Sequence, residues 1–389
     1  MNVKKGECNN VVLLLSTLIY ASDPVFSIHK SLRLPLFLMN IAVYSPVLGD
    51  VNSQSFIVET SFLLARLHSE HRFIIITDQR PGEQFSSYSN IKIIFVKPPL
   101  KNALFKKIWW DIKLPVVLRK EKADLFISLY NACSSTVVIP QLILIQNLEK
   151  TRKAHIKKAR LLIVPNKLIE KKLIKKFGIG EEKIAVIYPS ANKMSVPINE
   201  QKRETIKNRY SEGKEFFLFN SIFPVQKDFI NLLKSFSHFK KRQQSSFKLL
   251  VIGSPDSFFE KSLESYKYKN DVRFVEIKDK PEETLMIASA YAVVLPFNIN
   301  EDMITALNAM RSGVPVIAVK DSIINEAFGD AALYSETEAA KDIGEKMMQV
   351  YTNEGYRSRL IEKGKQVAGE FTGEKAAELL WQSIIKALE

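Results

Sequence analysis

Residues 295–318 read LPFNINEDMITALNAMRSGVPVIA, and the order of elements in this stretch decides the fold. An apolar strand ends at Pro296, a polar loop follows, and a helical pattern begins near Met303. Gly313 can take the left-handed conformation that ends a helix, and Pro315 opens the next apolar strand. Strand, loop, helix and strand in this order form the unit of a parallel α/β sheet. Because a helix N-terminus binds anions through its free N–H groups and dipole, the loop before Met303 is a candidate phosphate site.

The same alternation continues on both sides of this stretch, from Met39 to the end of the chain. In the first half we expect strands at residues 41–44, 73–77, 91–96, 125–128, 142–146, 161–165 and 184–188. In the second half we expect strands at residues 216–220, 248–252, 272–275, 292–296 and 314–319. Helices are expected at residues 55–67, 230–240, 281–288, 303–312, 339–351 and 373–388. We therefore predict an α/β fold of two Rossmann-like, doubly wound parallel-sheet domains facing across a cleft, with a ligand at the carboxyl ends of the strands.

The domain organisation follows from this pattern. We expect a first Rossmann-like domain, a second one, and a final helix that returns to the first domain, at residues 39–205, 206–370 and 371–389. Lys4 and Lys5 precede the apolar run 11–20, which loosely resembles a signal peptide, so residues 1–38 are predicted to be a leader or an upstream-start segment. No other apolar run reaches the roughly 18 residues that a membrane-spanning helix needs, and none is expected.

The residue counts exclude several kinds of site. Two cysteines are too few for a disulfide framework, and the five histidines show no HxxxH or HExxH pattern, so no metal site is expected. GxGxxG, GxxxxGK[ST] and GxSxG are absent, which argues against a dinucleotide fingerprint, a P-loop and an α/β-hydrolase.

The net charge of +14 requires a separate explanation. It indicates either a solvated basic face or a surface for anionic lipid headgroups or phosphorylated small molecules. No nucleic-acid-binding motif appears, so nucleic acid is not an expected partner. Trp109 and Trp110 are candidates for membrane contact, with half-buried helix residues as the alternative, because they lie beside Lys106, Lys107 and Lys113.

Residues 307–318, LNAMRSGVPVIA, resemble the signature of the family 4 (group 1) retaining glycosyltransferases, in which E-x7-E is followed by A-M-x-x-G-x-P-V-I. Residues 326–334 (EAFGDAALY), 230–236 (INLLKSF) and 110–115 (WDIKLP) are similar to further blocks of this family. The resemblance implies a GT-B fold with an acceptor-side first domain and a donor-side second domain. It also implies transfer of a hexose, with retention, from a nucleotide-sugar to a glycan or lipid-linked acceptor, as in bacterial cell-surface polysaccharide synthesis.

Such an enzyme needs no metal or other cofactor, and we expect it in the cytoplasm or peripheral to the inner face of the membrane. The donor-site residues nevertheless differ from the family pattern. The two glutamates of E-x7-E contact the donor sugar and the ribose, and their positions are Asn300 and Asn308 here. Asparagine lacks the charge-assisted strength of a carboxylate, and Glu301, one residue out of register, is a candidate substitute. Asp302 and Met303 occupy the family's glycine-bearing turn, so side chains stand where backbone N–H groups approach the donor.

The family's phosphate loop, G-S-x-x-P-R-K-N, corresponds to NSIFPVQKD at residues 220–228. Lys227 is retained and is the candidate for stabilising the departing diphosphate. Gln226 takes the place of an arginine whose bidentate phosphate contact glutamine cannot supply. Asn220 and Ser221 begin the loop and are candidate donor-binding residues.

Two other places complete the implied site. Gly253 follows strand 248–252 and is expected either to face the donor side of the cleft or to form a plain turn. On the acceptor side, Gln146 and Asn147 replace a His-Asp pair, and Gly49 is the single glycine of the loop after the first strand.

Residues of the family pattern are thus replaced at four separated motifs, which leaves three hypotheses open. The first is a glycosyltransferase. The second is a catalytically impaired relative that binds a glycan, a partner enzyme or a membrane. The third is a sugar-nucleotide epimerase of the same architecture, whose acidic and histidine residues have no candidates here.

Overall fold

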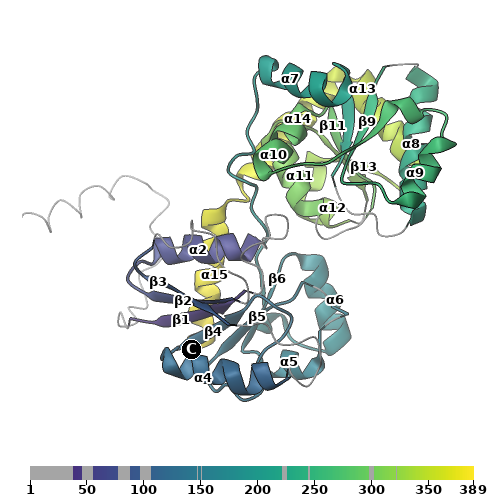
Figure 1. Cartoon of the computed structure of the whole chain (residues 1–389). Helices are drawn as coiled ribbons and strands as arrows, with labels where there is room; N and C mark the ends of the chain where they lie inside the picture. The colour runs from purple at the N-terminus through teal and green to yellow at the C-terminus, as the bar shows by residue number, and fades with distance from the viewer. Residues whose placement is uncertain are drawn as a thin grey trace, which may run out of the picture. The chain divides into compact units, whose positions relative to one another are not determined.

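The computed structural model describes residues 38–45, 56–77, 88–96, 107–146, 148–149, 151–220, 226–243, 246–297, 302–320 and 322–389. The leader predicted at residues 1–38 falls outside these ranges apart from its last residue. Five predicted site residues also lie outside the described residues: Gly49, Asn147, Ser221, Asn300 and Glu301. From Met39 onward the described chain forms two parallel sheets flanked by helices (Figure 1).

The first sheet has seven parallel strands in the order β3-β2-β1-β4-β5-β6-β7. Its strands are β1 (Asn40–Tyr44), β2 (Arg72–Thr77), β3 (Ile91–Phe95), β4 (Leu125–Ser128), β5 (Gln141–Leu144), β6 (Leu161–Val164) and β7 (Ile184–Val186). Its helices are α2 (Phe56–Leu67), a π-helical turn (Trp109–Lys113), α4 (Leu114–Lys120), α5 (Lys153–Lys158) and α6 (Lys167–Phe177). β4, β5 and β6 are buried along their whole length, as expected for parallel strands covered on both faces. The strand order reverses between β1 and β4, which makes this pair the switch point of the sheet.

The second sheet has six parallel strands in the order β10-β9-β8-β11-β12-β13. Its strands are β8 (Phe216–Phe219), β9 (Lys248–Ile252), β10 (Val272–Val275), β11 (Ala292–Leu295), β12 (Val316–Val319) and β13 (Leu333–Ser335). Its helices are α7 (Glu200–Ser211), α8 (Gln226–Gln243), α9 (Ser257–Glu264), α10 (Lys280–Ser289), α11 (Asp302–Arg311), α12 (Ile323–Phe328), α13 (Ala340–Thr352) and α14 (Glu354–Gly369). The order reverses between β8 and β11. The prediction of two Rossmann-like parallel-sheet domains is therefore confirmed.

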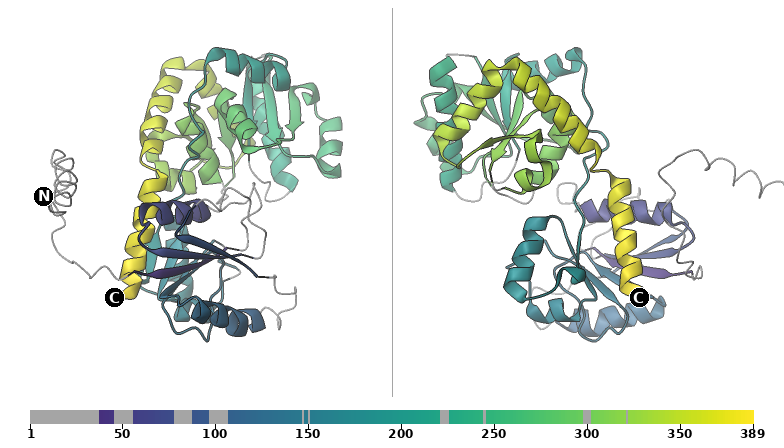
Figure 2. Two further views of the ribbon diagram at one scale, coloured as in Figure 1. Left: turned by 60° about the vertical axis from the view of Figure 1, so that its left-hand side comes forward. Right: turned by 180° about the vertical axis from the view of Figure 1, so that it is seen from behind.

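The last helix, α15 (Gly373–Leu388), packs against α2 and β5 of the first domain. Both views in Figure 2 show α15 beside α2. The apolar face of α15, which includes Ala377, Leu380 and Ile384, belongs to the same core as Leu64 of α2. Apolar residues at helical spacing explain why this helix docks on a core instead of standing alone in solvent. By contrast, α7 packs on α10 and β9, so the boundary placed between residues 205 and 206 cuts a helix that belongs as a whole to the second sheet.

Most predicted elements match within a few residues, and three differences matter for the site. α8 begins at Gln226 and not at residue 230, so Gln226 and Lys227 lie in its first turn. β13 was not predicted, because it is defined by its pairing with β12. Trp109 was considered for membrane contact, but it is 2% exposed and lies in the core under Tyr44, so that part of the prediction is wrong.

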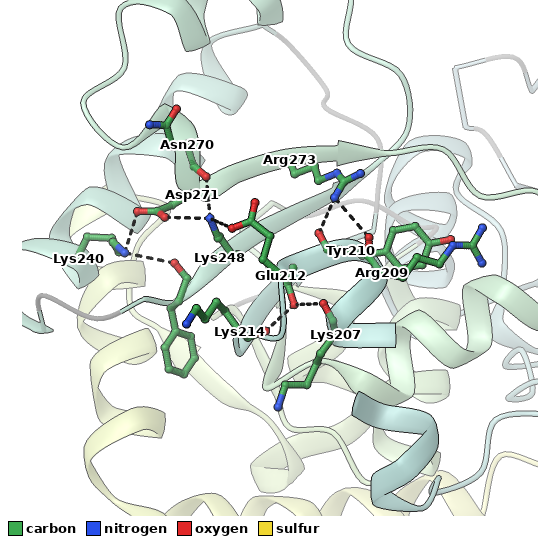
Figure 3. Close-up of polar contacts among 12 residues, drawn as sticks. Lys207, Arg209, Tyr210, Glu212, Lys214, Lys240, Lys248, Asn270, Asp271 and Arg273 are labelled. Carbon is green, nitrogen blue, oxygen red and sulfur yellow. Dashed lines mark hydrogen bonds and ion pairs between the residues drawn. The ribbon is translucent and has the colours of Figure 1, made fainter. Parts of the chain in front are cut away.

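A charge network ties together the amino-terminal edge of the second sheet. Asp271 forms ion pairs with Lys240 at 2.9 Å and with Lys248 at 3.4 Å (Figure 3). Lys248 also forms an ion pair with Glu212 at 3.1 Å. Arg273 donates to two carbonyls in the last turn of α7. The network lies at the opposite ends of the strands from the candidate site, so it supports the scaffold and not the chemistry.

Candidate functional site

Helix α11 forms the rigid side of the candidate site, directly after the switch-point strand β11. Its first residue, Asp302, is fully buried, and Met303 is 1% exposed. The helix ends where predicted, because Gly313 adopts the left-handed conformation with φ of +76° and its N–H donates to the Met310 carbonyl. A Cβ on Gly364 of α14 would lie 3.1 Å from Met310 Cγ, so the two helices are closely packed. Side chains on α11 are therefore held in fixed positions.

A chain of polar contacts links α11 to the end of β8 across the switch point. The Asn220 carbonyl accepts a hydrogen bond from Thr305 Oγ1 at 3.1 Å, and Asn220 Nδ2 donates to Glu283 Oε1 at 2.9 Å. Glu283 pairs with Lys280 at 2.7 Å, at the start of α10. The amide of Asn220 is thus already oriented by a carboxylate, and Lys280 brings a cation to the carboxyl ends of the strands.

Asn308, at the position implied to contact the donor ribose, is 8% exposed. Its Oδ1 accepts the backbone N–H of Asn192 at 2.8 Å, and Asn192 lies in the segment that joins the two sheets. The acceptor oxygen is therefore engaged by the connecting segment, and the Nδ2 group is the part of this side chain left to bind a ligand.

The first turn of α8 offers the anion-binding features that the sequence predicted. Gln226 and Lys227 are exposed, and Asp228 is partly exposed. Among the described residues, Lys227 forms no ion pair or hydrogen bond. The dipole of α8, whose positive end lies at this turn, favours an anion at the same place.

Gly253 lies at the carboxyl end of β9, beside β8. Its φ of +127° is a conformation that residues with a side chain rarely adopt, and its N–H donates to the Val275 carbonyl at 2.9 Å. A Cβ here would have no atom within 4 Å, so the backbone conformation and not crowding requires glycine. The neighbouring Ser254 hydroxyl donates to Glu276.

On the acceptor side, Gln146 follows β5 and is exposed. Its backbone N–H donates to Asn131 Oδ1 at 2.9 Å, which orders the loop after β4. His155 Nδ1 lies 3.3 Å from the Asn131 carbonyl, and burial lowers the pKa of His155. No motif pointed to Asn131 or His155, because their contact joins residues 24 positions apart in the chain.

A pocket of about 630 Å³ lies between α2, the connecting segment and the start of α15. Glu59, Arg66, Lys193, Arg311 and Glu374 give it charges of both signs. Burial raises the pKa of Glu59, and Lys280 and Lys193 oppose this shift. The pocket includes Asn192 and so borders the Asn308 contact.

Asn308 lies further along α11, where it contacts Asn192. The structure therefore places Asn220, Gly253, Asp302 and the first turn of α8 at the carboxyl ends of β8, β9 and β11. It adds Thr305, Glu283, Lys280 and Asn192, which no motif singled out. Within the described ranges, no group of three His, Cys, Asp or Glu side chains is placed to hold a metal ion. No helix among these residues is long and apolar enough to cross a membrane.

Residues 200–367 match the family model of the glycosyl transferases group 1, a range that spans the second sheet and its helices. Two curated relatives align with part of the chain. An uncharacterised glycosyltransferase, MJ1178 of Methanocaldococcus jannaschii, is 26% identical over 197 residues, which cover 46% of this chain and 54% of the relative. The O-antigen chain mannosyltransferase RfbU of Salmonella typhimurium is 25% identical over 186 residues, covering 47% of this chain and 48% of the relative. The chain thus spans about half the length of the curated relatives it matches.

Solved structures match over nearly the whole chain. A glycosyltransferase of Rickettsia africae has a TM-score of 0.75 at 14% identity, covering 90% of this chain and 99% of that one. HepE of Anabaena, solved with UDP-glucose, has a TM-score of 0.67 at 11% identity, covering 89% and 99%. At such identities the likeness establishes the fold alone. The chain therefore has the GT-B fold, and its residues 200–367 carry the sequence pattern of the glycosyl transferases group 1.

Proposed function

We propose that this chain transfers a hexose from a nucleotide-sugar to a glycan or lipid-linked acceptor, as in the synthesis of bacterial cell-surface polysaccharide. The observation that carries the proposal is the convergence of α8, Gly253 and α11 on the switch point of the domain that matches the group 1 transferases. RfbU, named as a mannosyltransferase, and HepE, solved with UDP-glucose, support this class of donor.

In this proposal, Lys227 and the positive end of the α8 dipole hold the diphosphate. Charge that develops on the leaving group is stabilised by donors already in place, with no metal ion. Asn308 Nδ2 contacts the ribose, since its Oδ1 is engaged by Asn192. The resemblance places the sugar beside the start of α11, at Asp302 and Met303. Retention follows from the family resemblance, and positioning of the two substrates supplies the remaining catalysis.

A titration with a panel of UDP- and GDP-sugars tests donor binding. Lys227→Ala should weaken the best donor roughly tenfold or more, the effect of removing one hydrogen bond to a charged group. Lys234→Ala is the matched control, because Lys234 is also exposed on α8 but lies two turns further along. If no nucleotide-sugar binds at millimolar concentration, the proposal is wrong.

A second function is favoured by two observations: Gln226 stands where the family has an arginine, and the Asn308 oxygen is already engaged. A protein of this kind would bind a glycan or a partner without transferring sugar. It is distinguished from the first by a donor that binds and is never consumed.

We also propose a cytoplasmic protein in peripheral contact with anionic lipid at the inner face of the membrane. A pocket of about 660 Å³ at the amino-terminal ends of β5 and β6 supports this contact. Five basic side chains that form no ion pair with a described residue line this pocket. They are Lys157, Lys158, Arg160, Lys183 and Lys386. Sedimentation with phosphatidylglycerol vesicles, but not with phosphatidylcholine vesicles, is the expected result. Equal sedimentation with both would contradict it.

A further inference from the structure

Tyr130 is an exposed aromatic residue at the switch point of the first sheet. It follows β4, whose Ser128 is paired in register with Tyr44, the last residue of β1. Tyr44 is 4% exposed, whereas Tyr130 is 46% exposed. Open α/β sheets bind their ligands outside the carboxyl ends of the strands, at the point where the order reverses. Tyr130 therefore stands where the first domain is built to receive a ligand.

The Tyr130 ring is supported from behind by a stack of aromatic rings. Trp110 lies parallel to it, with centroids 6.3 Å apart and planes inclined by 19°. Trp110 in turn meets Tyr44 edge-on at 5.3 Å, and Tyr44 packs on the buried Trp109 at 4.7 Å. Offset and edge-on arrangements of this kind are the favourable ones for aromatic rings. One side of the Tyr130 ring is thus fixed, and its exposed area is available for contact.

The backbone that carries Trp110 is unusual and holds the Tyr130 loop in place. Residues Trp109–Lys113 form a π-helical turn, a rare conformation that is frequent at functional sites. Asp111, within the turn, accepts hydrogen bonds from Ser135 N at 2.8 Å and Ser134 Oγ at 3.4 Å. The WDIKLP block thus has a structural task that the donor chemistry does not use: it orders the loop after β4.

Two residues with amide side chains lie in the loops after β4 and β5. Asn131 follows Tyr130 directly and is bonded to the backbone of Gln146, whose own side chain is exposed. A sugar ring presents polarised C–H groups on its faces and hydroxyls around its edge. An aromatic face attracts the C–H groups through its negative quadrupole, and amides both donate to and accept from hydroxyls.

We propose that Tyr130 is the stacking platform for a sugar ring of the acceptor. The inference rests on the proposed function, since it takes the acceptor to be a glycan. Tyr130 would then help to determine acceptor specificity through contact between the face of its ring and the sugar.

The test is saturation-transfer NMR on the full chain with methyl glycosides of the common hexoses and N-acetylhexosamines at millimolar concentration. Saturation of aromatic protein protons should reach the C–H groups of one face of a glycoside. Tyr130→Leu should weaken binding of that glycoside roughly fivefold, the effect of losing one aromatic contact, whereas Tyr130→Phe should retain it. Tyr268→Leu, which removes a tyrosine ring from the second domain, is the matched control.

Each result has one meaning when nucleotide-sugar binding is measured on the same samples. If no glycoside receives saturation, or if Tyr130→Leu binds as well as the parent protein, the platform is refuted. If nucleotide-sugars bind while the glycosides do not, the proposed function stands and only this inference fails. If glycosides contact Tyr130 but no nucleotide-sugar binds, the inference about sugar contact stands and the proposed transfer fails.

Discussion

Replacing Asn308 by alanine should destabilise the fold and weaken donor binding at the same time. The side chain is 8% exposed, and its Oδ1 accepts the Asn192 N–H at 2.8 Å. Losing this acceptor leaves a partly buried N–H without its partner, at a cost of about 1–3 kcal/mol. Alanine recovers about 0.5 kcal/mol through its higher helix propensity. The expected loss in the free energy of unfolding is therefore about 0.5–2.5 kcal/mol.

Urea unfolding followed by circular dichroism measures this loss, and nucleotide-sugar titration measures the effect on the donor. Asn308→Asp retains the acceptor oxygen and should keep the stability of the parent protein. Lys227→Ala should weaken donor binding and leave the stability unchanged. The reason is that the exposed Lys227 has no partner among the described residues. The reasoning fails if Asn308→Ala unfolds at the same urea concentration as the parent protein.

Three further changes test the scaffold. Asp271→Asn removes the carboxylate that pairs with Lys240, a side chain that is only 5% exposed. The free energy of unfolding should therefore fall by about 3 kcal/mol. Urea unfolding measures this loss, and an unchanged midpoint would contradict it. Ion pairs with Lys92 and Arg72 lower the pKa of Glu121 in the folded state, so their stabilisation is present above the unfolded pKa of about 4.3 and disappears as the pH falls further. The stability difference between the parent protein and Glu121→Gln should therefore shrink from pH 6 to pH 3, whereas a constant difference would rule out this role. Gly313→Ala should cost about 1–2 kcal/mol because alanine is strained at a φ of +76°, and an unchanged melting temperature would show that the cap has no such constraint.

Much of the fold could be predicted because local and global signals agree. The strand at residues 248–252 and the helix at 373–388 are apolar runs with regular periodicity, and the structure has them at the same residues. Gly313 predicts a helix end because glycine, which has no Cβ, adopts the left-handed backbone conformation without strain. The three-residue strand Leu333–Ser335 gave no pattern of its own, since it is defined by pairing with β12.

The site could be predicted only in part, because its contacts join distant residues. Asn308 was expected to line the cleft, but its bond to Asn192 crosses 116 residues and has no sequence signature. The contacts of Thr305 and Glu283 with Asn220 could not be predicted for the same reason. Trp109 and Trp110 look alike in sequence, but in the π-helical turn Trp109 is buried and Trp110 stacks on Tyr130.

The most direct test of the central claim is consumption of the donor. The purified protein is incubated with millimolar UDP- and GDP-sugars, with and without glycan acceptors, and release of the nucleoside diphosphate is measured over time. The account predicts release from at least one donor, faster with acceptor present and reduced in Lys227→Ala but not in Lys234→Ala. A donor that binds at the α8 site yet is never cleaved would contradict sugar transfer and leave a GT-B protein that only binds.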